Sequence, residues 1–469
     1  MRRVAAIIAA VPLLAIAFPA AAGTSIVVRQ DPGPGGFMSP NVTYVGTIPL
    51  DSPGVGGKVV KVGDQTRFYV TGLKGISIYD VSDPALPVPL GHLPFPHSQN
   101  EDVDVSADGS RLVIAADGSL LLPVAPHSTG IHVFDTSNPA VITYLGSSPL
   151  VNKPHDAFPT NVQRRAEHTA TCADEKCEWI YGRTGTIYDA TDPADIKIAG
   201  DWRPADGDPA RPTQIHALIR DEAGLVIADS TPRLVLDPRE NPAAPTVLAF
   251  GRHESELDTR LQHNSVRPLA DQWQPREPLA EDATEEEIAE YAKLRPGELL
   301  IGNSESNLNT GCSSAGGLST WSMKDFDKGA TLQQIESFRP FNGDWQDGNP
   351  AINALGCSGH WFTENDNFVT AGWYEHGIRF FQIDPTNGDI EQVGFFQPVA
   401  TEASAAHWVD DEYVYTVDYA RGIDILRFDR GGPLPMQAEF DASWLANLDR
   451  QGALADRERY LCGLAGSQG

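Results

Sequence analysis

The sequence predicts an all-β fold, a seven-bladed β-propeller closed by a strand from the N-terminal part of the chain. A unit of short strand-like segments recurs seven times between residues 43 and 430. Its copies follow one another at about 40–50 residues, which is the spacing of propeller blades. The 43 glycines and 36 prolines also suit the many tight turns of such a fold.

The repeated unit is clearest at residues 67–90, which read RFYVTGLKGISIYDVSDPALPVPL. Stretches of β-branched, aromatic and alternating apolar residues are separated there by a glycine turn and an Asp-Pro turn, which indicates three strands. The other copies begin at the second of these strands, and a pair of strand-like segments precedes them, so we expect four strands per blade. Related segments occupy residues 130–146, 185–200, 233–250, 377–396 and 422–429, with a degraded copy at 317–340.

The two ends of the repeat region predict how the ring closes. The last unit stops after its third strand at Phe428, while residues 43–48 (TYVGTI) match the fourth-strand segment at residues 144–146. We therefore expect residues 43–48 to supply the missing strand, which removes the exposed sheet edges.

The segments IYDVSDP, RLVIAAD and GLVIADS resemble those of the LVIVD-repeat β-propeller proteins. The resemblance covers roughly residues 43–430, and its motifs are repeat motifs. It implies a propeller and, because many members are exported bacterial proteins, export. It implies no reaction, and no catalytic residue carries over from it.

The N-terminus predicts export independently. Arg2 and Arg3 precede an apolar run at residues 4–18, and small residues at 20–22 form a cleavage site, so residues 1–22 are expected to be a signal peptide. Residues 23–42 are then a linker, and the mature protein is expected to be secreted or periplasmic and soluble, with no transmembrane segment. The formal charge of −28 argues against nucleic-acid partners.

Two segments interrupt or follow the repeats. Residues 271–297 form a predicted helical insert between the first and second strands of the fifth blade, where Thr284 and Glu287 have capping-box spacing. Residues 431–469 form a C-terminal tail with a helix expected around residues 442–459.

Five histidines stand at the same place in five successive units, at the expected start of the innermost strand. They begin the segments HTATC, HALIR, HNSVR, HWFTE and HWVDD. Aligning the second blade on RLVIAAD places Asp102 at this position. First strands line the propeller axis, so we expect these side chains to converge at one mouth of the channel: His168, His216, His263, His360, His407 and Asp102.

Loops on the same face supply further polar side chains. These are the loops that enter the first strand and those that join the second strand to the third. They are expected to place around the histidines, as substrate-facing groups or hydrogen-bond partners of the ligands, the residues His97, Glu167, Asp229, Glu305, Glu375, His376, Asp418 and Arg421.

The five cysteines are expected to form disulfides in an exported chain. Cys172 and Cys177 flank a four-residue turn and predict one bridge. Cys312 and Cys357 form the next plausible pair, joining two loops near His360, and Cys462 is left over.

Clustered imidazoles suit divalent transition metals, so the sequence predicts a metal site for Fe, Cu, Mn or Zn. An exported metalloprotein, an oxidoreductase or a hydrolase, is one reading. The alternative is a non-enzymatic propeller whose face binds a small molecule, a protein or a cell-envelope partner. The catalytic residues, the reaction and the oligomeric state are not indicated by the sequence.

Overall fold

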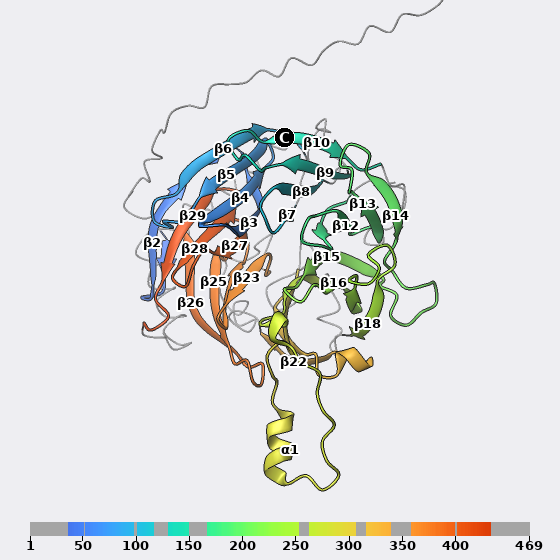
Figure 1. Ribbon diagram of the computed structural model, residues 1–469. Coiled ribbons are helices and arrows are strands. Elements are labelled where there is room, and N and C mark those ends of the chain that lie inside the picture. Colours follow the sequence, from blue (N-terminus) through green and yellow to red (C-terminus); the bar gives the residue numbers. More distant parts are fainter. Residues whose placement is uncertain are drawn as a thin grey trace, which may run out of the picture.

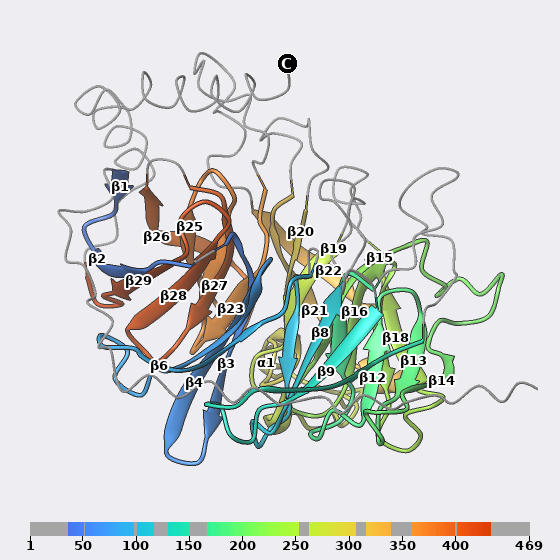
Figure 2. The ribbon, with the colours of Figure 1, turned by 90° about the horizontal axis from the view of Figure 1, so that it is seen from above.

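The computed structural model is an all-β propeller of seven blades (Figure 1). It describes residues 36–50, 52–97, 101–116, 130–149, 167–252, 262–305, 316–338, 358–398 and 401–432. Contacts join the first strands of all seven neighbouring pairs of blades, so these strands line the axis as expected. Figure 2 shows the strands running from one face of the ring toward the other.

Each blade is an antiparallel sheet of four strands, with a fifth strand added to the sixth blade. Blades one to three consist of β3 (Gly54–Val62), β4 (Gln65–Gly72), β5 (Gly75–Asp80) and β6 (Val88–Pro94); β7 (Val103–Val105), β8 (Arg111–Ala116), β9 (Gly130–Asp135) and β10 (Thr143–Ser147); and β11 (Ala170–Cys172), β12 (Trp179–Gly182), β13 (Thr186–Asp189) and β14 (Lys197–Asp201).

The remaining blades follow the same order. They consist of β15 (Gln214–Arg220), β16 (Val226–Thr231), β17 (Arg233–Asp237) and β18 (Thr246–Gly251); β19 (Gln262–Val266), β20 (Leu299–Ser304), β21 (Leu318–Ser322) and β22 (Gln333–Phe338); β23 (Phe362–Asn365), β24 (Phe368–Gly372), β25 (Ile378–Ile383) and β26 (Ile390–Pro398); and β27 (Ala403–Trp408), β28 (Tyr413–Asp418) and β29 (Ile423–Phe428).

The ring closes as the sequence predicted. Strand β2 (Val42–Ile48) pairs antiparallel with β29 and completes the seventh blade, and the blue and red strands lie side by side in Figure 1. Strand β1 (Gly36–Met38) pairs with β26 of the sixth blade, in a stretch expected to be a linker. The N-terminal strands β1 and β2 are thus paired with the last two blades.

The core lies between blades rather than within them. Within the described residues, seven clusters of buried apolar side chains each join two neighbouring blades. Between blades six and seven, for example, Phe380 stacks on Phe428 with ring centroids 4.5 Å apart. The alternation along each strand places one set of side chains in each of the two flanking clusters, which explains the sequence pattern.

The predicted insert is present between β19 and β20 and contains a short 3₁₀ turn at Ala270–Gln272 and helix α1 (Glu285–Ala292). A second 3₁₀ turn, Phe326–Lys328, lies between β21 and β22. Thr284 and Glu287 form the expected capping box. Helix α1 projects from the ring in Figure 1, and none of its residues is buried. The expected C-terminal helix lies outside the described residues, and no helix of the described part is long and apolar enough to cross a bilayer.

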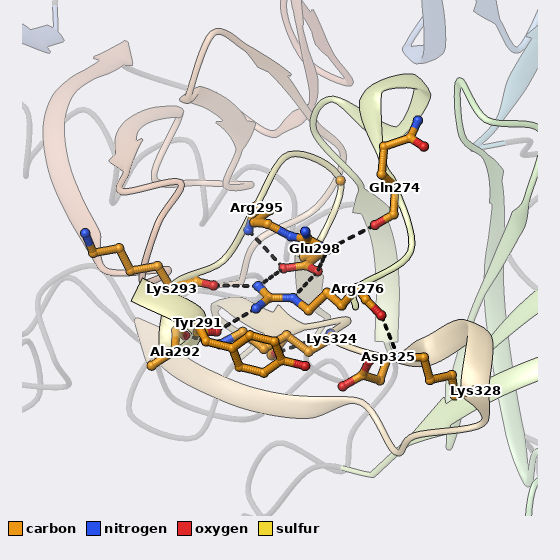
Figure 3. Close-up of polar contacts among 12 residues, drawn as sticks. Gln274, Arg276, Tyr291, Ala292, Lys293, Arg295, Glu298, Lys324, Asp325 and Lys328 are labelled. Carbon is orange, nitrogen blue, oxygen red and sulfur yellow. Dashed lines mark hydrogen bonds and ion pairs between the residues drawn. The ribbon is translucent and has the colours of Figure 1, made fainter. Parts of the chain in front are cut away.

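A buried arginine fixes the base of this insert (Figure 3). The guanidinium of Arg276 forms a salt bridge with Glu298 and donates to the carbonyls of Tyr291 and Lys293 at 2.5 and 2.6 Å. The side chains of Arg276 and Glu298 are only 3 % and 1 % exposed. This contact joins the start of the insert to its end, on either side of α1.

Candidate metal centre

Five side chains from five successive blades meet in the interior of the ring. Three of them, Glu101, His168 and His360, lie two residues before the first strand of their blade. His216 and His263 lie within the first strands β15 and β19, where each strand departs from regular pairing with its neighbour. We call Glu101, His168, His216, His263 and His360 the His–Glu cluster.

The four imidazoles face one atom. The Nε2 atoms of His168, His216, His263 and His360 lie 2.9, 3.3, 3.3 and 3.5 Å from Oε2 of Glu101. The rings follow one another around this oxygen, with centroid separations of 5.0, 4.3 and 4.0 Å from His168 to His360. The cluster therefore presents four imidazole nitrogens and one carboxylate at a common point, and its members form two of the ligand groups with metal-compatible spacing.

The Nδ1 atoms of the imidazoles, which face away from Glu101, differ in their hydrogen-bond partners. Nδ1 of His360 lies 2.5 Å from the carbonyl oxygen of Ser404, so it carries the proton and donates. Nε2 then faces Glu101, as a lone pair in the neutral ring and as a second N–H donor in the charged ring. Nδ1 of His216 and Nδ1 of His263 are buried without a hydrogen-bond partner among the described residues.

Burial and charge act together on the cluster. Burial raises the pKa of Glu101, but His168 and His360 outweigh it and hold this pKa well below the ordinary value. Burial lowers the pKa of His360, yet the Glu101 carboxylate raises it further and the net shift is upward. Burial, reinforced by neighbouring imidazoles, lowers the pKa of His216 and His263. Two of the rings are thus neutral near pH 7, the form that binds metals.

A second carboxylate stands beside the cluster. Oε2 of Glu305, which follows β20, lies 3.5 Å from Nε2 of His216, and His216, His263 and Glu305 form a third possible ligand group. The hydroxyl of Tyr374 donates to Oε1 of Glu305 at 2.5 Å. The sequence placed Glu305 near the histidines, and the structure does so too.

Asp102 and His407 lie outside the three ligand groups. Asp102 is buried next to Asp104, and burial together with that carboxylate raises its pKa well above the ordinary value. His407 is the fifth residue of β27 and packs on Phe68 with ring centroids 5.6 Å apart. The four remaining predicted histidines are brought together, and their role as metal ligands stays a prediction.

The other predicted neighbours of the site have contacts within their own blades, and Asp229 also accepts from Ser265 of the fifth blade. Glu167 accepts hydrogen bonds from Thr184 and Tyr188. The remaining members bind locally: Nδ1 of His97 contacts the Phe95 carbonyl, Asp229 pairs with Arg233, the Glu375 carbonyl accepts from Gln397, the His376 amide donates to the Trp373 carbonyl, Asp418 accepts from Thr401, and Arg421 pairs with Asp424.

The structure confirms one of the expected disulfides. Cys172 and Cys177 are joined across the turn between β11 and β12. Cys312, Cys357 and Cys462 lie outside the described residues.

Glu101, the central residue of the cluster, was not predicted from the sequence. A usable signal was present: Glu101 precedes the apolar Val103 by two residues, as His168 precedes Ala170 and His360 precedes Phe362. Aligning the second blade on the downstream segment RLVIAAD selected the neighbouring Asp102 instead.

Comparisons with known proteins support the fold alone. No family model and no curated protein matches the chain. A solved β-propeller domain of Cps50 (Swd1) from Myceliophteria thermophila is 11 % identical, with 83 % of this chain and all of that chain covered and a TM-score of 0.51. A putative 6-phosphogluconolactonase from Bacteroides uniformis is 14 % identical over 73 % of this chain and 84 % of its own, with a TM-score of 0.45. The chain is a seven-bladed β-propeller with distant structural neighbours.

Proposed function

We propose that this protein is an exported metalloprotein that binds one transition metal ion in the His–Glu cluster and uses it as an oxidoreductase. One observation carries the proposal: four Nε2 atoms lie within 2.9–3.5 Å of a single Glu101 oxygen. Imidazole nitrogen with carboxylate oxygen is a donor set for Fe, Mn, Cu and Zn.

The proton positions favour a cation at this point. Because His360 donates through Nδ1, the neutral form of this ring turns a lone pair toward the Glu101 carboxylate, and two acceptors then face each other at 3.5 Å. The Glu101 carboxylate accordingly raises the pKa of His360. Burying such a contact costs free energy unless a positive charge lies between them. A proton on His360 supplies this positive charge for one ring, whereas a divalent ion supplies it for all four rings.

The number of donors favours a redox-active ion. Four imidazoles and one carboxylate exceed the tetrahedral set that Zn adopts in most protein sites. With five protein donors an octahedral Fe or Mn ion keeps one open position, which suits binding and activation of a single small ligand. We therefore place Fe and Mn ahead of Cu and Zn.

Export and ancestry are part of the proposal. The charged start, apolar run and small-residue site at residues 1–22 support a signal peptide. The disulfide between Cys172 and Cys177 is compatible with an oxidising compartment. The repeat segments support a relation to the LVIVD-repeat propellers.

Metal analysis of the purified protein tests the proposal. The protein is loaded with Fe(II), Mn(II), Cu(II) or Zn(II) in turn, and bound metal is measured by mass spectrometry after gel filtration. We expect about one ion per chain, and a loss of at least about tenfold in affinity for His263→Ala.

Two histidine variants serve as matched controls. His92 is exposed on β6, and His407 is buried but outside the ligand groups. His92→Ala and His407→Ala should retain the ion. Wild-type protein that binds none of the four metals, or His263→Ala that binds as much as the controls, would show that the proposal is wrong.

A further inference from the structure

Glu305 and Tyr374 form one side of the His–Glu cluster. Glu305 follows β20 of the fifth blade, and Tyr374 follows β24 of the sixth. The Tyr374 ring lies 4.8 Å from the His360 ring, and Oε2 of Glu305 lies 3.5 Å from Nε2 of His216. The hydrogen bond between them, 2.5 Å long, therefore spans the cluster from His216 to His360.

Solvent reaches this side of the cluster. The Glu305 side chain is 17 % exposed, against 10 % for His168, 3 % for Glu101 and 0 % for His263. Tyr374 is also half-buried. A small ligand that approaches the buried imidazoles from this side passes beside the hydrogen-bonded pair of Glu305 and Tyr374.

The backbone holds Tyr374 in an unusual conformation. Its φ is +43°, in the left-handed region that residues with a side chain seldom adopt. Hydrogen bonds of 3.0 Å run in both directions between Tyr374 and Ala403 of the seventh blade and fix this conformation. The result is a phenol aimed at Oε1 of Glu305, which leaves Oε2 turned toward the histidines.

We propose that Glu305 selects the ligand at this site, and that Tyr374 is the positioning residue that holds Glu305 in place. The inference rests on the proposed metal site. A divalent ion together with Glu101 and Glu305 has no net charge, so an anionic ligand makes the buried site negative, which is costly. Oε2 of Glu305 accepts a hydrogen bond from a neutral ligand such as water or an alcohol. The substrate class is therefore a neutral molecule with an O–H or N–H group.

Ligand binding to the Co(II)-loaded protein tests the inference without any assay of activity. Azide serves as the anionic probe and imidazole as the neutral probe with an N–H group, and both are followed by the visible absorption of Co(II). We expect Glu305→Gln to raise the azide affinity about tenfold or more, because it removes a negative charge next to the bound anion. Its imidazole affinity should change less than about threefold, since the amide can turn its oxygen toward the ligand while its NH₂ group donates to the Tyr374 hydroxyl oxygen.

Two further variants sharpen the result. Tyr374→Phe releases Oε1 of Glu305, so the carboxylate can turn onto the metal and compete with both probes, and we expect both to bind more weakly. Glu240→Gln makes the same change of charge at an exposed position of the fourth blade and should leave both affinities unchanged.

The outcomes separate this inference from the proposed function. If Glu305→Gln retains Co(II) but binds azide as Glu240→Gln does, ligand selection by Glu305 is wrong and the metal site stands. If Tyr374→Phe binds both probes as wild type does, Tyr374 does not position Glu305. A wild-type protein that retains no Co(II) overturns the proposed function, and this inference with it.

Discussion

Glu101 is the residue at which the four imidazoles of the cluster meet, and its neighbours show why one position along the chain matters. Successive side chains of an extended segment point to opposite sides. Glu101 accordingly contacts His168, while Asp102 lies near Asp104, two residues along. Asp104 in turn pairs with Lys58 and accepts from the Cys172 amide at 2.7 Å. The adjacent residues Glu101 and Asp102 therefore lie in different surroundings, Glu101 among the imidazoles and Asp102 near Asp104.

Substitution of each acid separates these roles. Glu101→Gln keeps the size of the side chain but removes the charge that faces the four imidazoles, so we expect metal affinity to fall by at least about tenfold. Asp102→Asn should reduce it less than about threefold, because Asp102 lies outside the ligand groups. Isothermal titration of metal-free protein with Mn(II) measures both, and equal losses would contradict the assignment of Glu101.

His407 gives a pH-dependent contribution to stability. Burial lowers its pKa from 6.5 to about 3. The folded protein therefore keeps this ring neutral, and its stabilising effect is complete above pH 6.5 and is lost as the pH falls toward 3. Between pH 6.5 and 5 the free energy of unfolding should fall by about 2 kcal/mol on account of this group.

His407→Gln removes that contribution. Urea unfolding of wild type and variant at pH 6.5 and pH 5 measures it, and the wild type should lose about 2 kcal/mol more than the variant. An equal loss in both proteins would show that His407 does not titrate in this way.

The candidate site could be predicted where the repeats show which residues occupy equivalent positions in successive blades. Four histidines that open equivalent segments do meet, because equivalent positions in blades converge on the axis. The repeat alignment failed by one residue at Glu101, where β7 has only three residues. It also grouped His407 with the others, although His407 lies well inside β27, opposite Tyr415. Pairing between strands, which a single sequence does not define, decides both cases.

At the scale of elements, the hairpin of β11 and β12 has short strands, and a disulfide links its two sides. The two strands have three and four residues, and Cys172 and Cys177 close the turn between them. Linking residues five apart stabilises a fold by about 2 kcal/mol in the chain-entropy account.

Replacing both cysteines by alanine tests this contribution. We expect Cys172→Ala/Cys177→Ala to lower the free energy of unfolding by about 2 kcal/mol. Metal binding should be retained, since both cysteines belong to the apolar cluster between the second and third blades and lie outside the ligand groups. Urea unfolding with and without a reductant provides the control: the reductant should weaken the wild type and leave the variant unchanged.

The salt bridge between Arg276 and Glu298 holds together the two ends of the insert that carries α1. Arg276→Met leaves the buried Glu298 carboxylate without its main partner, which costs about 3 kcal/mol. Local opening of the insert should become roughly a hundredfold more frequent. Digestion with a glutamate-specific protease, which cuts within α1, measures that rate. Arg276→Met/Glu298→Met should recover much of the resistance, and equal rates in wild type and Arg276→Met would contradict the role of the base.

At the scale of the molecule, the ring depends on β2. The sequence predicted this closure because the last repeat lacks a fourth strand and residues 43–48 supply its pattern. The fifth strand β1 was not predicted, since three residues carry no periodic signal. The alternation along the strands predicts that apolar side chains cluster between the blades. Which side chains contact one another depends on the packing of whole blades, which the alternation does not define.

Truncation tests the closure. A chain beginning at residue 50 lacks β2 and exposes the edge of β29, so we expect it to aggregate and to lose its cooperative unfolding transition. A chain beginning at residue 36 keeps β1 and β2 and should behave as the longer protein does. Gel filtration and thermal unfolding distinguish the two, and a monomeric, equally stable chain from residue 50 would exclude closure by β2.

X-ray absorption spectroscopy of the metal-loaded protein tests directly whether one metal ion binds in the His–Glu cluster. We expect one bound ion with four imidazole nitrogens and a carboxylate oxygen in its coordination shell, and loss of one imidazole in His263→Ala. A spectrum without imidazole scattering, or one that is identical in wild type and His263→Ala, would contradict it.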